Sequence, residues 1–197
     1  MVWTTRGPYG VDFAAYYLAT RALEQGRNIY ALNTADWGTL AAEAQVSEVE
    51  PPYRYPPLIA GILRPTALLP FTTALFIWRA CTVLALLLAS LCLSQFLRQR
   101  WVDPLVFFAA AFFVPVITTL YAGQANTFVL AALAAFLLLD QRRRPWLAGT
   151  ALAFSILIKP LSIAIAAYLI WRRDWQRLAA LLVGMAIGVV VMAIISG

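Results

Sequence analysis

The chain has 197 residues, of which 62% are hydrophobic and 12% charged, and its mean hydropathy is +0.77. A soluble domain has roughly 45–50% apolar and about 25% charged residues, so this composition excludes a soluble globular domain and indicates surface that faces lipid. The formal net charge is +6, but most bases stand in short clusters between apolar runs, which is typical of membrane topology and excludes a nucleic-acid-binding protein. The absence of histidine excludes sites built on that residue.

Residues 1–65 form a polar region with almost equal numbers of acids and bases. An amphipathic helix is expected over 12–25, with Gly26 at its end, and a short helix over 39–44. The proline-rich stretch 51–57 cannot be helical. Residues 58–63 are apolar but too short to cross a bilayer, so they predict an interfacial or re-entrant helix. We therefore expect an extracytoplasmic loop with juxtamembrane helices over 1–65.

Residues 66–197 predict a bundle of transmembrane helices, which makes the fold class all-α and polytopic. Each apolar run ends at proline, at a polar break or at a basic cluster. Pro115 is expected to kink the second crossing. The expected crossings are 71–97, 104–121, 127–139, a hairpin of 146–158 and 161–170, and 178–195.

The basic clusters at 98–100, 142–144 and 172–177 predict the orientation. All three lie in the cytoplasm only if Lys159-Pro160 is the tip of a helical hairpin. The alternative, one long broken helix over 146–170, would leave Arg172 and Arg173 outside. In the hairpin arrangement the polar first third, the break at 121–126, Lys159 and the end of the last helix share the outer face.

Two charged residues on this outer face are candidates for chemistry. Asp12 is a usable general base, although an acid at a helix start also stabilises the free N–H groups there. Lys159 is the only lysine in the sequence and interrupts an apolar stretch. It suits the phosphate of a lipid-linked substrate, or it is a lysine that extends toward the interface.

Polar and aromatic residues near these two charges are candidates for binding. Gln124 and Asn126 stand where a helix pair turns and can bind sugar hydroxyls or cap the helices. Prolines flank a short segment that contains Tyr53, Arg54 and Tyr55. This segment forms either a rigid binding wall or an ordered loop.

The order of several short motifs resembles glycosyltransferase family 87, a family of polytopic GT-C enzymes. The likeness spans nearly the whole chain. The motifs, in order, are Asp12-Phe13 with Tyr16-Tyr17, Gly26-Arg27-Asn28-Ile29-Tyr30, Tyr55-Pro56-Pro57-Leu58, Trp78, Gly123-Gln124-Ala125-Asn126, Ala148-Gly149 and Ile158-Lys159-Pro160.

The resemblance implies a GT-C-like fold and an inverting transfer of a sugar, with mannose as the expected sugar, from a polyprenyl-phosphate donor. The acceptor would be a glycan or glycolipid, and the enzyme would lie in a bacterial inner membrane with its active face outside. Asp12 matches the catalytic base of such enzymes. Lys159, Gln124, Asn126, Tyr16, Tyr17, Arg54 and Tyr55 are the expected substrate-binding residues.

No cofactor or metal is expected, because a single carboxylate is a poor Mg²⁺ site and no phosphate-binding glycine-rich loop is visible. The first ten residues contain no apolar leader although the topology places them outside, so we expect the chain to be a fragment. Two other functions stay open: a transporter or flippase of lipid-linked sugars, and a non-catalytic membrane assembly subunit.

Overall fold

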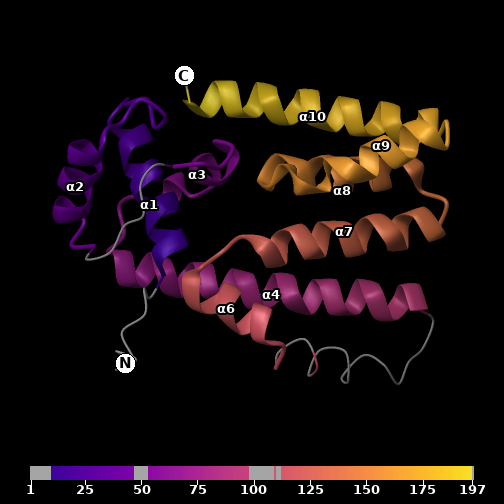
Figure 1. Ribbon diagram of the computed structural model, residues 1–197, viewed down its shortest axis with the longest axis horizontal. Helices are drawn as coiled ribbons and strands as arrows, with labels where there is room; N and C mark the ends of the chain where they lie inside the picture. The colour runs from indigo at the N-terminus through magenta and orange to yellow at the C-terminus, as the bar shows by residue number, and fades with distance from the viewer. Residues whose placement is uncertain (1–9, 47–52, 98–108, 110–111, 197) are drawn as a thin grey trace, which may run out of the picture.

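A computed structural model describes residues 10–46, 53–97, 109 and 112–196, and the regular elements in this part of the chain are all helical (Figure 1). Phe71–Leu97 and Trp175–Ile194 are long and apolar enough to cross a membrane, with hydropathies of 2.1 and 2.4, and shorter apolar helices pack beside them. The expected all-α bundle of membrane helices is confirmed for the described residues.

The first helices form a compact cap at one end of the bundle (Figure 1). They are α1 (Val11–Glu24), α2 (Thr34–Glu43) and α3 (Leu58–Ile62), followed by a 3-10 turn at Arg64–Thr66. The middle of α1 is buried on all sides, because α2, α3 and α4 surround it. The expected helix is present with its bounds shifted by one residue at each end, and its charged residues stand in its first and last turns.

Helix α2 begins five residues before the predicted helix over 39–44 because of its N-terminal cap. The Asn33 side chain accepts a hydrogen bond from the Asp36 N–H, and the Asp36 carboxylate accepts one from the Asn33 N–H, each at 3.0 Å. This reciprocal pair satisfies two N–H groups that a helix start leaves without partners.

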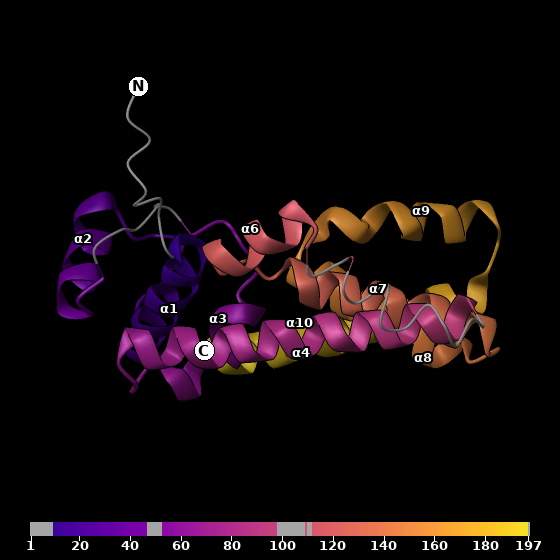
Figure 2. The ribbon, with the colours of Figure 1, turned by 90° about the horizontal axis from the view of Figure 1, so that it is seen from below.

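The bundle consists of α4 (Phe71–Leu97), α6 (Val114–Ala122), α7 (Asn126–Gln141), α8 (Pro145–Ile158), α9 (Ile163–Trp171) and α10 (Trp175–Ser196). Helix α7 packs between α4 and α8, and α10 covers the other side of α8 (Figures 1 and 2). Most of α10 is exposed, as expected of a helix that faces lipid.

Pro115 does not kink a helix. Helix α6 begins at Val114, so Pro115 stands in its first turn, where the missing N–H has no helical partner to lose. The extended backbone of Phe113 ends any helix before it. The prediction of a kink was wrong, and most of the earlier part of the expected crossing, with the basic cluster at 98–100, lies outside the described residues.

The chain reverses direction after α8. Lys159 lies beside Asn126 at the start of α7, whereas Arg177, in the first turn of the helix that follows α9, pairs with Asp140 near the end of α7. Helices α8 and α9 therefore run in opposite directions (Figure 2). The buried hydroxyls of Ser155 and Ser162 lie 2.6 Å apart across the bend. That both arms lie in the bilayer stays a prediction.

The two ends of the bundle differ in charge. At one end Arg142 contacts Gln95, and Arg177 pairs with both Asp140 and Asp174, so the clusters at 142–144 and 172–177 lie together. The cap of α1 to α3 lies at the opposite end (Figure 1). The two basic clusters and the cap thus lie at opposite ends of the bundle, as the positive-inside rule requires. Which end faces the cytoplasm stays a prediction.

Small residues bring α8 and α10 into close contact. A Cβ atom on Gly149 would lie 2.5 Å from the Cβ of Ala180 and 2.6 Å from the Arg177 carbonyl oxygen. A Cβ on Gly184 would lie 2.8 Å from that of Ala153. Such contacts allow the two backbones to approach within van der Waals distance along their length.

We expect Gly149→Ala to destabilise the protein by about 1–3 kcal/mol, because the added methyl overpacks the α8–α10 contact. Gly38→Ala in α2 is the matched control, since a Cβ there meets nothing within 4 Å. Both changes gain about 0.5–1 kcal/mol of helix propensity. Thermal unfolding in detergent should show a lower Tm for Gly149→Ala only, and equal Tm values would contradict this account of the contact.

Candidate active site

Five polar side chains from four separate segments meet where the cap joins the bundle. We call Asp12, Tyr55, Gln124, Asn126 and Lys159 the polar cluster. Asp12 stands in the first turn of α1, Gln124 and Asn126 at the turn between α6 and α7, and Lys159 just after α8. All five are partly exposed, so the cluster is open to a ligand.

Three hydrogen bonds connect the two charges of the polar cluster. Lys159 Nζ donates to Asn126 Oδ1 at 3.0 Å, and Asn126 Nδ2 donates to Gln124 Oε1 at 2.5 Å. Gln124 Nε2 then donates to Asp12 Oδ2 at 2.9 Å. Each donor points toward the carboxylate, so the orientation of both amides is determined by the ammonium at one end and the carboxylate at the other.

A tyrosine hydroxyl reaches the other carboxylate oxygen. The Tyr55 hydroxyl donates to Asp12 Oδ1 at 3.2 Å, and the Tyr16 hydroxyl contacts both Tyr55 and the Ala125 backbone N–H. Burial, and then the neighbouring Tyr55, raise the pKa of Tyr16 far above its usual value, so this hydroxyl stays neutral. Both oxygens of Asp12 thus accept a hydrogen bond, which orients the carboxylate without burying it.

The turn that carries Gln124 and Asn126 lies directly on the first turn of α1. Gly123 has φ of +75°, a left-handed conformation that favours glycine. A Cβ atom at Gly123 would lie 2.6 Å from the Cβ of Phe13. Only glycine therefore permits both the backbone conformation and the close approach that brings Gln124 within hydrogen-bonding distance of Asp12.

Helix α4 holds this turn from the other side. Trp78 Nε1 donates to the Gly123 carbonyl at 2.8 Å, and Arg79 donates to the carbonyls of Leu120 and Tyr121. Sequence reasoning noted Trp78 without assigning it this contact. A buried indole N–H usually needs a partner, which was the signal for a structural role.

Three expected site residues are not members of the polar cluster: Tyr16, which contacts it through Tyr55, and Tyr17 and Arg54, which lie away from it. The Tyr17 hydroxyl donates to the Leu69 carbonyl at 2.6 Å, and its ring packs against Phe71. Neighbouring residues on an α-helix point about 100° apart, so Tyr16 and Tyr17 cannot both face Asp12. Arg54 is exposed beside Tyr55. Thr119, which sequence reasoning did not select, accepts from Asn126 Nδ2 at 3.4 Å.

The described residues contain no group of three or more acidic, cysteine or histidine side chains that could hold a metal ion. The chemistry of the polar cluster is that of a carboxylate that can accept a proton and an ammonium that can bind an anion. The two are separated by neutral amides, which can bind hydroxyl groups.

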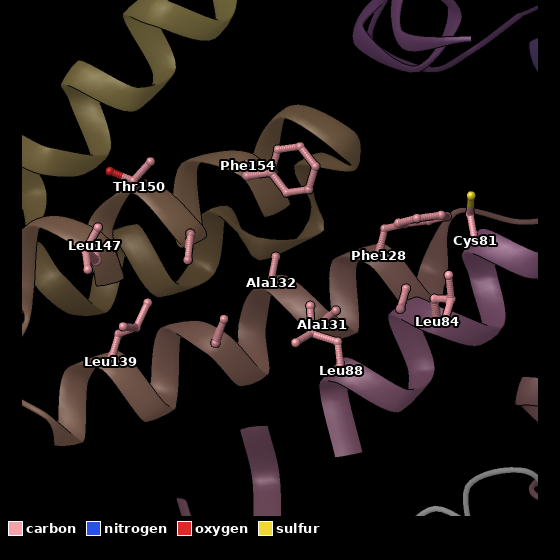
Figure 3. A pocket seen from close by; sticks show the side chains of 13 residues that line it. Cys81, Leu84, Leu88, Phe128, Ala131, Ala132, Leu139, Leu147, Thr150 and Phe154 are labelled. Carbon is pink, nitrogen blue, oxygen red and sulfur yellow. The ribbon is translucent and has the colours of Figure 1, made fainter. Parts of the chain in front are cut away.

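An apolar groove runs along α7 from its first turn. It has a volume of about 680 Å³ and lies between α4, α7 and α8 (Figure 3). Phe128 lines it and packs on Trp78 with ring centroids 4.9 Å apart, and from there the groove extends to Leu139 and Leu147. Among its lining side chains, Cys81 carries a sulfur atom and Thr150 carries an oxygen atom (Figure 3).

Comparisons with known proteins point to one family. The model of glycosyltransferase family 87 matches residues 53–196. Two Mycobacterium tuberculosis proteins, from strains CDC 1551 / Oshkosh and ATCC 25618 / H37Rv, are each named alpha-(1->3)-arabinofuranosyltransferase and are 27% identical over 203 residues. The match covers 100% of this chain and 44% of each relative. No solved structure matches.

We expect Trp78→Phe to destabilise the protein by about 1–3 kcal/mol, because the buried Gly123 carbonyl loses its donor. Trp175→Phe is the control, since that side chain is 63% exposed. Thermal unfolding of the two variants in the same detergent measures the difference. A Trp78→Phe protein as stable as the control would show that the indole does not hold the turn.

Proposed function

The chain belongs to glycosyltransferase family 87, and we propose that it transfers a sugar from a polyprenyl-phosphate donor to an acceptor hydroxyl, with Asp12 as general base. The observation that carries the proposal is the hydrogen-bonded chain from Asp12 to Lys159. It places a proton acceptor and a cation at the two ends of one partly exposed polar strip.

Asp12 would act on the acceptor. Its carboxylate accepts the proton of the acceptor hydroxyl as the oxygen forms a bond to the anomeric carbon of the sugar. Tyr55 and Gln124 each occupy one lone pair of the carboxylate, which leaves further lone pairs for the acceptor. Because the oxygen attacks from the face opposite the leaving phosphate, this single displacement inverts the anomeric configuration.

Lys159 would act on the leaving group. As the bond between the anomeric carbon and the phosphate oxygen breaks, negative charge grows on the polyprenyl phosphate, and the ammonium stabilises it. Asn126 holds Lys159 through its carbonyl oxygen, which uses one of the three ammonium hydrogens. The remaining hydrogens stay available to phosphate oxygens.

The apolar groove would hold the start of the polyprenyl chain. Its lining is almost entirely aliphatic and aromatic, its volume falls within the range of about 300–1,000 Å³ for ligand pockets, and Phe128 brings one end of it to the same end of α7 as Asn126. A donor with its phosphate at Lys159 can thus lay its chain between α4 and α8, with the sugar between the two charges.

The transferred sugar is proposed to be mannose or arabinofuranose. The family resemblance implies mannose, whereas the relatives are named for transfer of arabinofuranose. The chain spans less than half the length of those relatives, so the activity is proposed for the protein as a whole.

We further propose that residues 1–65 lie outside the cytoplasm and that 66–197 form the bundle in a bacterial inner membrane. The acceptor would be a glycan or glycolipid.

Transfer should require the Asp12 carboxylate. We expect Asp12→Asn to lower transfer by about 10²–10⁴-fold, because the amide cannot accept the proton. Glu24→Gln is the matched control on the same helix, since its exposed ion pair with Arg64 contributes little. The assay measures radiolabelled sugar transferred by membranes of equal protein content, with polyprenyl-phosphate-mannose and polyprenyl-phosphate-arabinofuranose as alternative donors.

Equal transfer by Asp12→Asn and Glu24→Gln would remove Asp12 from catalysis. Absence of transfer from both donors by the unchanged protein would contradict the proposed reaction and favour a transporter or an assembly subunit.

Two variants should separate the phosphate site from the groove. Lys159→Met is expected to weaken transfer from long-chain and short-chain donors alike, by roughly tenfold or more, because both carry the phosphate. Ala132→Trp, which fills the groove, is expected to raise KM for long-chain donors only. The measurement is kcat and KM with donors of both lengths. An Ala132→Trp protein with unchanged KM for the long-chain donor would contradict the position proposed for the chain.

A further inference from the structure

A second cavity lies at the far end of α1 from Asp12. It has a volume of about 330 Å³, and its lining residues come from the last turn of α1, the loop that follows it, and Pro57. Leu23 lines it three helical turns after Asp12, which is about 16 Å at 5.4 Å per turn. The reaction proposed above assigns no role to this cavity.

The lining combines apolar and polar groups. Leu23, Ile29 and Pro57 contribute apolar surface, whereas Arg27 and Asn28 contribute donors. The Asn28 side-chain oxygen accepts from the Tyr30 N–H at 3.0 Å, so its two amide hydrogens are left for other partners. A mixture of this kind suits a ligand with both C–H faces and hydroxyl groups.

The charge of the lining disfavours an anion. Arg27 forms an ion pair with Asp36. A hydrogen bond from the Asn33 N–H, and then Arg27, lower the pKa of Asp36, so the carboxylate is ionised at neutral pH and the pair has no net charge. A phosphate or carboxylate ligand would therefore find no unbalanced cation in this part of the lining.

A row of tyrosines connects this cavity to the polar cluster. The rings of Tyr30 and Tyr53 have centroids 6.0 Å apart, and those of Tyr53 and Tyr55 are 5.9 Å apart. The Tyr30 hydroxyl donates to the Tyr55 carbonyl at 2.8 Å, and the Tyr55 hydroxyl donates to Asp12. Tyr30 is 56% exposed, Tyr55 is partly exposed and Tyr53 is buried beneath them.

We propose that the cavity is a distal subsite for the acceptor, and that the acceptor is an oligosaccharide which extends from it along Tyr30 and Tyr55 to Asp12. The C–H faces of sugar rings pack on aromatic rings, and their hydroxyls bond to groups such as Asn28 and Arg27. The inference rests on the proposed role of Asp12 in transfer. It adds that the enzyme recognises several linked, uncharged sugars rather than only the one that reacts.

The test is the dependence of transfer on acceptor length. The probes are methyl glycosides of α-linked mannose and of α-linked arabinofuranose, from one sugar upward. We expect kcat/KM to rise with length in the unchanged protein. Tyr30→Ala should reduce the ratio of kcat/KM for the longest over the shortest acceptor by roughly 2- to 10-fold, because one stacking contact is lost.

Two further variants separate stacking from other effects. Tyr30→Phe retains the ring and should retain most of the preference for long acceptors. Tyr168→Ala removes a tyrosine that is 47% exposed near the opposite end of the bundle, and should leave the ratio unchanged. Equal kcat/KM for all lengths in the unchanged protein, or equal ratios for Tyr30→Ala and Tyr168→Ala, would overturn the subsite.

A binding measurement distinguishes this proposal from the catalytic one. Isothermal titration calorimetry with the longest oligosaccharides uses the Asp12→Asn protein, with and without Tyr30→Ala. Binding that weakens with Tyr30→Ala supports the subsite even if no transfer is observed, in which case only the proposed reaction fails. Binding that is absent, or is unaffected by Tyr30→Ala, overturns the subsite whether or not transfer occurs.

Discussion

The contact between Gly123 and the first turn of α1 positions the rest of the site. Because no side chain separates Gly123 from Phe13, the turn between α6 and α7 lies directly over Asp12. The carbonyls of Leu120 and Tyr121 at the end of α6 accept hydrogen bonds from Gly10 and Arg79, and the Gly123 carbonyl just after it accepts one from Trp78. The backbone that carries Gln124 and Asn126 is thus held by α1 and α4 together.

The amide pair between Asp12 and Lys159 gives both charges partners without joining them. In a direct ion pair each charge would satisfy the other, and neither would remain free for a substrate. Here the carboxylate accepts from neutral donors and the ammonium donates to a neutral acceptor. The carboxylate and the ammonium are therefore both hydrogen-bonded although they are partly buried. Each can still bind a further group, as the proposed transfer requires.

Most of the candidate site could be named from the sequence, though not its geometry. Asp12, Tyr55, Gln124, Asn126 and Lys159 were all selected, because polar residues at helix ends and in apolar stretches stand out. Tyr17 and Arg54 were selected by proximity to such residues and lie outside the polar cluster, since neighbouring side chains point in different directions. Thr119 was missed because nothing local distinguishes a buried threonine that contacts Asn126 from one that only packs.

The sequence by itself determined the helical membrane class and most of the helix bounds, because apolar runs, prolines and basic clusters act within a few residues of where they stand. The predicted segment 71–97 is α4 to the residue, and α7, α8, α9 and α10 begin and end within three residues of their predicted positions, whereas α6 begins ten residues after the predicted start at 104. Only the tertiary structure decided which helix ends meet. Asp12 and Gln124 stand 112 positions apart, and their contact depends on the close approach at Gly123 and on donors from α4. Such long-range pairing reflects packing of the whole chain, which no local pattern encodes.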